Sequence, residues 1–126
     1  MPSRFLKIFQ TVDLPKLRSL QELRILVRTC LEQSEKVVGK MPSGLRFKPM
    51  KSQWGSCNSA DIIALNTRLM FLPDRLVAYI VHHEMVHLKI RRHDRSFRAA
   101  VEILFPDRLA LDKQLHAAGP ILRQKL

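Results

Sequence analysis

The sequence has little cysteine and no long apolar run. Cys30 and Cys57 are the only cysteines in 126 residues, which is too few for the disulfide framework of a small secreted protein. Both are therefore expected to be reduced thiols packed in a core. No stretch approaches 18 uncharged apolar residues, so no membrane insertion is expected. The basic start also lacks the continuous apolar core of a signal peptide. Together these absences predict a cytoplasmic protein.

Acidic residues are scarce as well. The chain has 11 Asp and Glu against 22 Lys and Arg, which gives a formal net charge of +11. Such a balance invites an anionic partner, such as nucleic acid, a membrane surface or an acidic substrate. The cations are spread over the whole chain, so a nucleic-acid partner stays open without being favoured. The densest run comprises Lys89, Arg91, Arg92, Arg95 and Arg98.

The composition is typical of one folded domain. Hydrophobic residues make up 46% and charged residues 26% of the chain, which excludes a disordered protein. We therefore expect residues 1–126 to form a single domain with a modest core. Residues 1–14 are expected to be a leader. Residues 119–126, which begin at a Gly-Pro stop signal, are expected to be either a loose tail or an inhibitory one.

The first half of the chain predicts one helix and a small sheet. Ser19 and Glu22 fit a capping box and Gly39 fits a stop, so a helix is expected from about residue 19 to about 38. Strand patterns follow in three short segments, at residues 45–48, 52–57 and 62–66. The fold class is therefore α+β, with a small, mostly antiparallel sheet of about three strands packed on helices.

A second helix carries the chemistry. It is expected to start at Pro73 and Asp74, and it is apolar on nearly every side, which places it at the centre of the domain. It contains an H-E-x-x-H motif, His83-Glu84-Met85-Val86-His87. The spacing puts both imidazoles on one face, one turn apart, where they can bind Zn²⁺. Glu84 lies where a carboxylate can act as general base toward a metal-activated water.

The third zinc ligand is expected to be His93. In an unbroken helix His93 would lie about 9 Å further along the axis and about 240° around from His87. Zinc–nitrogen bonds of about 2.0–2.1 Å cannot span that separation, so the helix must end between the two residues. Glu102 and Asp94 are the alternatives, and Glu102 can instead orient a ligating imidazole. Asp94 also fits the cap of a following helix.

Other polar and aromatic residues near the motif carry weaker signals. Trp54 and Tyr79 are weak candidates for substrate binding, and packing in the core is the favoured interpretation of both. His82 adjoins His83 and is therefore expected to point away from the metal. Asn66 is expected to bond backbone groups near the end of its strand.

Three motifs follow one another at short spacing: QWGSC at 53–57, IIALNTRLMFLP at 62–73 and HHEMVHLKIRRHDRSF at 82–97. In this combination the chain resembles the YgjP-like metallopeptidases, a branch of the zincin clan. The resemblance covers about residues 45–100. It implies that His83, His87 and His93 bind zinc and that Glu84 is the general base. Because the chain lacks the longer N-terminal β-rich region of most members, it is similar to the minimal, single-domain forms called minigluzincins.

The resulting expectation is a zinc-dependent metallopeptidase that hydrolyses a peptide or protein substrate. One alternative is a nucleic-acid-associated protease similar to the SprT-like proteins, which the basic charge favours and the short spacing to His93 opposes. The other is a latent or non-catalytic zinc-binding module. Glu84 argues against that module, because a structural zinc site needs four ligands and no base.

Overall fold

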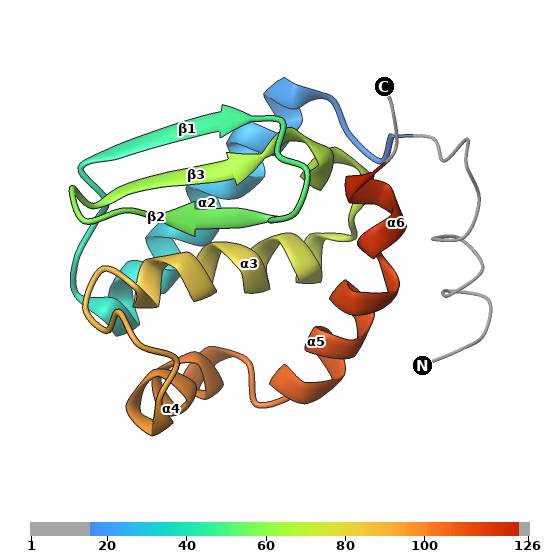
Figure 1. Ribbon diagram of the computed structural model, residues 1–126. Helices are drawn as coiled ribbons and strands as arrows, with labels where there is room; N and C mark the ends of the chain where they lie inside the picture. Colours follow the sequence, from blue (N-terminus) through green and yellow to red (C-terminus); the bar gives the residue numbers. More distant parts are fainter. Residues whose placement is uncertain (1–15, 124–126) are drawn as a thin grey trace.

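The computed structural model describes residues 16–123, and its helices and strands form an α+β fold. A three-stranded sheet lies above helix α3, with α4 and α5 below it and α6 to one side (Figure 1). The elements, in chain order, are α2 (Leu20–Val38), β1 (Gly44–Lys48), β2 (Gly55–Cys57), β3 (Ile62–Asn66), the 3-10 helix η1 (Thr67–Phe71), α3 (Asp74–Val86), α4 (Arg95–Leu104), α5 (Arg108–Ala117) and α6 (Gly119–Leu122). The predicted leader, residues 1–14, lies outside the described residues.

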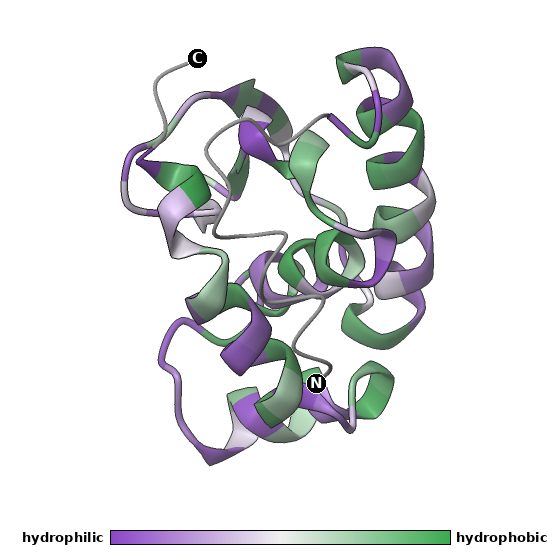
Figure 2. Cartoon of the chain, turned by 90° about the vertical axis from the view of Figure 1, so that its right-hand side faces the viewer, coloured by the Kyte–Doolittle hydropathy of each residue, from purple (hydrophilic) through white to green (hydrophobic). Residues whose placement is uncertain are grey.

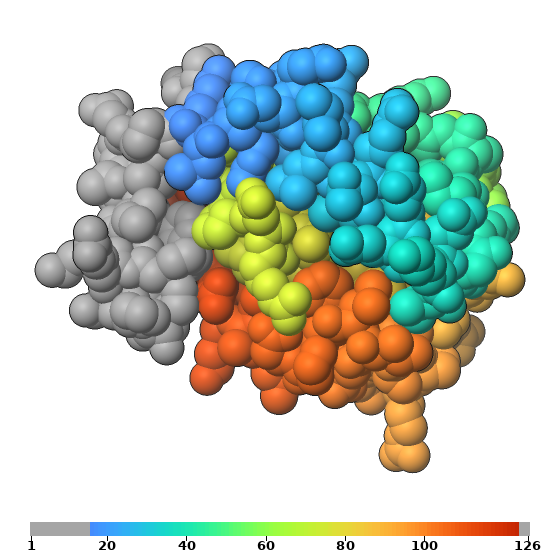
Figure 3. Space-filling view, turned by 180° about the vertical axis from the view of Figure 1, so that it is seen from behind, coloured from blue at the N-terminus to red at the C-terminus, as the bar shows by residue number. Residues whose placement is uncertain are grey.

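Helix α2 has the ends that its sequence predicts. The Ser19 hydroxyl accepts a hydrogen bond from the Glu22 amide, and the Glu22 carboxylate accepts one from the Ser19 amide. At the other end Gly39 adopts a left-handed conformation with φ of 78°, which glycine reaches without steric cost. The helix buries one stripe of residues against α3 and extends across the back of the molecule (Figure 3).

The sheet is mixed rather than mostly antiparallel. Its strand order is β1-β3-β2, with β1 parallel and β2 antiparallel to β3. The tight turn at residues 58–61 folds β2 back onto β3, which explains the antiparallel pair. Strand β3 is buried along most of its length, so it needs a neighbour on each side, and β1 occupies the second side. Strands β1 and β2 are therefore the two edges of the sheet.

Helix α3 is the buried centre of the domain, as predicted. Its apolar residues contact α2 on one side and the sheet and later helices on the others, and Leu76, Val77, Val81 and Met85 are fully inaccessible to solvent. In Figure 2 hydrophobic and hydrophilic stretches alternate along the other helices, and each of these helices contributes buried apolar residues to the core.

The chain turns sharply after α3. The helix ends at Val86, with His87 as its C-cap, and α4 begins at Arg95 with Asp94 as its N-cap. The predicted break between His87 and His93 is therefore confirmed. It requires neither glycine nor proline.

The end of the described chain is packed rather than loose. Residues 119–122 form α6, in which Ile121 and Leu122 are buried in the core. Residues 119–122 are therefore not a loose segment, because the apolar surface of both side chains is covered by the domain. Residues 124–126 lie outside the described part, and inhibition by them stays a prediction.

None of the helices formed by residues 16–123 is both long enough and apolar enough to span a bilayer.

Candidate metal centre

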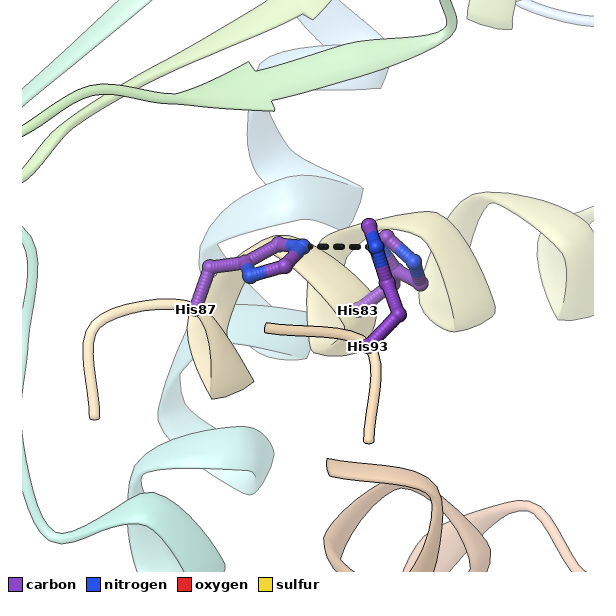
Figure 4. Close-up of side chains that lie close together, drawn as sticks. All are labelled: His83, His87 and His93. Carbon is purple, nitrogen blue, oxygen red and sulfur yellow. Dashed lines mark hydrogen bonds between the residues drawn. The ribbon is translucent and has the colours of Figure 1, made fainter. Parts of the chain in front are cut away.

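Three imidazoles converge at the end of α3. His83 and His87 lie one turn apart on this helix, and His93 returns to them from the loop after it (Figure 4). The potential ligand atoms of the three rings all lie within 4.8 Å of one another. The Nε2 atoms of His87 and His93 are 3.0 Å apart. The break in the helix therefore brings His93 to the two motif histidines, as the sequence predicts.

The hydrogen bond of His87 prepares its other nitrogen for a metal. Its Nδ1–H donates to the carbonyl oxygen of Ile90 at 3.0 Å, and this acceptor fixes the tautomer because a carbonyl cannot donate. Burial lowers the pKa of His87, an effect that outweighs the opposing bond to Ile90. The neutral ring then points the Nε2 lone pair at the cluster, which is the form that binds a divalent cation.

The three rings suit a tetrahedral metal ion. Ligand nitrogens about 2.0–2.1 Å from a tetrahedral centre are separated by about 3.3 Å, close to the spacing of the two Nε2 atoms. Three imidazoles also form a donor set that leaves one coordination position open. The residues present therefore fit a zinc-type site with a free position, rather than a closed structural site.

Glu84 is buried beside the histidines. It is 6% exposed, and its Oε2 lies 3.3 Å from Nδ1 of His83. Gly55 of β2 makes room for it: a Cβ atom at Gly55 would lie 3.1 Å from Cγ and 3.2 Å from Oε2 of Glu84. The carboxylate is thus confined between the edge strand and the imidazole cluster without belonging to that cluster.

Phe97 forms an aromatic floor beneath the three rings. Its ring centroid lies 5.0 Å from that of His83, 4.5 Å from that of His87 and 4.8 Å from that of His93. The side chain is 3% exposed, and it belongs to α4, whose N-cap Asp94 accepts the Phe97 amide hydrogen bond. The cap that starts α4 therefore also places the residue against which the imidazoles pack.

The two acidic alternatives for a third ligand are engaged elsewhere. Glu102 has a half-exposed side chain, and its Oε1 lies 3.9 Å from Nε of Arg108. Asp94 accepts hydrogen bonds from the Ser96 hydroxyl and the Phe97 amide. In the described part of the chain, the cluster of potential ligands contains neither of them.

A cavity of about 240 Å³ opens beside His83 and Glu84. Both weak substrate-binding candidates, Trp54 and Tyr79, line it. The Tyr79 hydroxyl, however, donates to Oδ1 of Asp112 at 2.5 Å. Burial, together with this bond, raises the pKa of Tyr79 well above its usual value. The remaining lining residues come from β2 and the segment before it, from α3 and from α5: Gln53, Gly55, Ile80, Asp112 and Leu115.

Two polar residues near the site have structural partners, as expected. Asn66 is fully buried, and its amide group donates to the carbonyl oxygens of Met50 and Gln53, both at 2.8 Å. It thereby fixes the segment that leads to Trp54.

His82 points away from the cluster: its Nδ1 accepts from the Ser34 hydroxyl at 2.6 Å, and its Nε2–H donates to the Ala100 carbonyl at 3.1 Å. Burial lowers the pKa of His82, which keeps this bridge between α2 and α4 neutral.

Sequence reasoning placed the histidines and Glu84 but missed part of their surroundings. It gave no role at the site to Phe97, Gly55 or Asp112. The close sequence position of Phe97 to His93 is a signal for its contact with the rings. The sequence holds no such signal for Asp112, which is one of several polar residues on a helix that mixes polar and apolar side chains.

Comparisons with known proteins agree with this geometry. The family described as YgjP-like, metallopeptidase domain, matches residues 17–118. Among solved structures, the chain is similar to the crystal structure of the metallopeptidase zymogen abylysin of Pyrococcus abyssi, with 27% sequence identity and a TM-score of 0.58. That match covers 70% of this chain and 95% of the other. The comparison with curated proteins finds no match.

Proposed function

The chain belongs to the YgjP-like metallopeptidase family, and from that premise we propose that it is a zinc-dependent peptidase of one domain. His83, His87 and His93 are the proposed metal ligands. The convergence of their ligand atoms within 4.8 Å, next to a buried glutamate, is the observation that carries the proposal. When bound, zinc would supply Lewis acidity toward a water molecule and toward the scissile carbonyl.

Glu84 is the proposed general base. Its carboxylate is held at the edge of the imidazole cluster, 3.3 Å from the His83 ring, and Gly55 and the neighbouring strand restrict its movement. It can receive a proton at Oε2 and later deliver it to the leaving amine. Because it lies outside the ligand set, it can change protonation state without releasing the metal.

Strand β2 is the proposed binding edge for the substrate. It is the edge of the sheet that contacts α3, and its residue Gly55 adjoins Glu84. A peptide added to this edge in an extended conformation would run past the imidazole cluster. The neighbouring cavity, with Trp54 on one wall and Leu115 on the other, can then receive a substrate side chain next to the scissile bond.

The direct test is metal analysis of the purified full chain combined with a peptidase assay on a degenerate peptide library. We expect about one zinc ion per chain and cleavage that a chelator abolishes and added zinc restores. Absence of stoichiometric metal, or cleavage that persists after the metal has been removed, would contradict the proposed function.

Replacing Gly55 by alanine is expected to lower peptidase activity about 10- to 100-fold while zinc stays bound. The added methyl would crowd Glu84 and lie 3.3 Å from Cδ2 of the fully buried Leu65, and displacing a catalytic group by a fraction of an ångström costs about this much. Initial rates and zinc content of the variant measure the effect. Gly44→Ala, in the other edge strand, is the matched control, because its Cβ meets only Ile62 at an ordinary 3.4 Å. Equal losses in both variants would show that general strand damage, not Glu84, is responsible.

A further inference from the structure

Hydrogen bonds fix the loop between His87 and His93 at several points. The His87 ring donates to the carbonyl oxygen of Ile90 within the loop. At its far end, Nη1 of Arg98 donates to the carbonyl oxygen of His93 at 3.2 Å. Between these two points Arg91 reaches away from α3 and α4 to the sheet. Its side chain hydrogen-bonds the loop to residues 30 and 33 positions earlier in the chain.

The guanidinium of Arg91 contacts three acceptors at the end of β2 and in the turn after it. Nη1 donates to the Asn58 carbonyl oxygen at 2.9 Å and lies 3.5 Å from Sγ of Cys57. Nη2 donates to Oδ1 of Asp61 at 2.6 Å. Such a multiple contact uses the planar fork of arginine and fixes orientation as well as distance.

The turn that receives Arg91 is ordered by its own hydrogen bonds. The side-chain oxygen of Asn58 accepts from the amides of Ala60 and Ile62 at 2.9 and 3.0 Å. Asp61 has a positive φ of 62°, and its second carboxylate oxygen pairs with Lys40 at 2.7 Å. Arg91 therefore bonds to a turn whose conformation other contacts already stabilise.

We propose that Arg91 is a positioning residue that clamps the His93 loop to the β2–β3 turn and so holds the third imidazole in place for the metal. The inference rests on the proposed function, because it takes the three histidines as zinc ligands. Its physical basis is preorganisation: His93 follows Arg91 by two residues, and a loop fixed at Arg91 loses less freedom when zinc binds. The side chain of Arg91 is 47% exposed, so the proposal concerns metal affinity rather than the stability of the fold.

The zinc affinity of matched arginine variants tests the proposed positioning role of Arg91. Loss of a positive charge alone would lower the zinc Kd, whereas loss of the contacts that hold the loop would raise it. Arg91 and Arg92 are adjacent cations near a site for a divalent cation, so removing either charge would by simple electrostatics strengthen zinc binding. Arg92→Ala is expected to leave the zinc Kd unchanged or to lower it. Arg91→Ala is expected to raise the zinc Kd at least about tenfold, in the range seen when groups behind metal ligands are removed. Lys40→Ala, which deletes the other ion pair of Asp61, is expected to raise the zinc Kd less than Arg91→Ala does, because the hydrogen bonds of Asn58 still order the turn.

The Kd is measured on the full chain by competition with a chromophoric zinc chelator. A shift in the visible spectrum of the Co²⁺-loaded Arg91→Ala protein is the second readout, and thermal unfolding of the metal-free variants reports any structural damage. Asp61→Asn removes the principal acceptor of Arg91 and is expected to raise the zinc Kd as Arg91→Ala does. The Kd of the double variant is expected to be no higher than that of the single variant with the higher Kd, because both changes remove the same contact. Arg91→Lys, which keeps the charge but loses the fork, carries the test if Arg91→Ala does not fold, and is also expected to bind zinc more weakly than the wild type.

Wild-type zinc affinity in Arg91→Ala, or in Arg91→Lys when Arg91→Ala does not fold, would overturn the clamp. An equal loss in the Arg92→Ala or Lys40→Ala variant would do the same. These results leave the proposed function intact, because the wild type still binds zinc. A wild-type chain without zinc affinity would instead overturn the proposed function, and the clamp with it.

Discussion

Replacing Glu84 by alanine is expected to abolish peptide hydrolysis while zinc stays bound and the fold stays intact. The carboxylate lies beside the three imidazoles but outside their cluster of ligand atoms, so catalysis and metal binding should separate. Removing a positioned general base lowers the rate about a hundredfold or more. Glu84→Gln, which preserves the shape of this buried side chain, is expected to give the same loss.

The measurement pairs initial rates with zinc content and melting temperature for each Glu84 variant. Glu35→Gln is the control, since Glu35 is an exposed glutamate on α2 and its replacement should change none of the three quantities. Loss of zinc together with activity would mean that Glu84 binds the metal or supports its ligands instead of acting as base.

The second large effect is expected at His93. His93→Ala should raise the zinc Kd by orders of magnitude, because it removes one of the three proposed ligand nitrogens. The two that remain, on His83 and His87, would fill only half of a tetrahedral coordination shell. Its Nε2 lies 3.0 Å from that of His87, and a methyl group cannot replace that donor.

Glu102→Ala is the matched test of the competing assignment, and it is expected to leave zinc affinity unchanged. The Glu102 side chain points to Arg108 and is half exposed. Titration of both variants with zinc against a competing chelator distinguishes the two residues. Retention of zinc by His93→Ala combined with its loss by Glu102→Ala would reverse the assignment.

The elements that could be predicted from the sequence are those that local contacts determine. The capping box of Ser19 and Glu22 and the left-handed Gly39 lie within or next to α2, so their side chains alone mark its ends. The break after His87 follows from a different local constraint, the reach of three imidazoles to one ion. The histidine cluster was therefore predictable even though a loop delivers one of its members.

Contacts between distant segments were not predictable in this way. The parallel pairing of β1 with β3 depends on which strand is buried on both sides, a property of the whole domain. The wall that α5 adds beside His83 depends on how the chain turns at Pro106. Arg91 finds Asp61 across 30 positions, and among 22 basic and 11 acidic residues no pattern marks that pair.

The histidine cluster and the cavity walls come from different stretches of the chain. The three imidazoles, Glu84 and the aromatic floor all belong to residues 83–97, whereas the cavity is walled largely by residues 53–55 and 112–115. Evolution can therefore alter the shape of the cavity proposed to receive a substrate side chain, at Trp54 or Leu115 for example, without touching the proposed hydrolytic centre. For the same reason, a library randomised at these two wall positions is the natural starting point for changing peptide preference by selection.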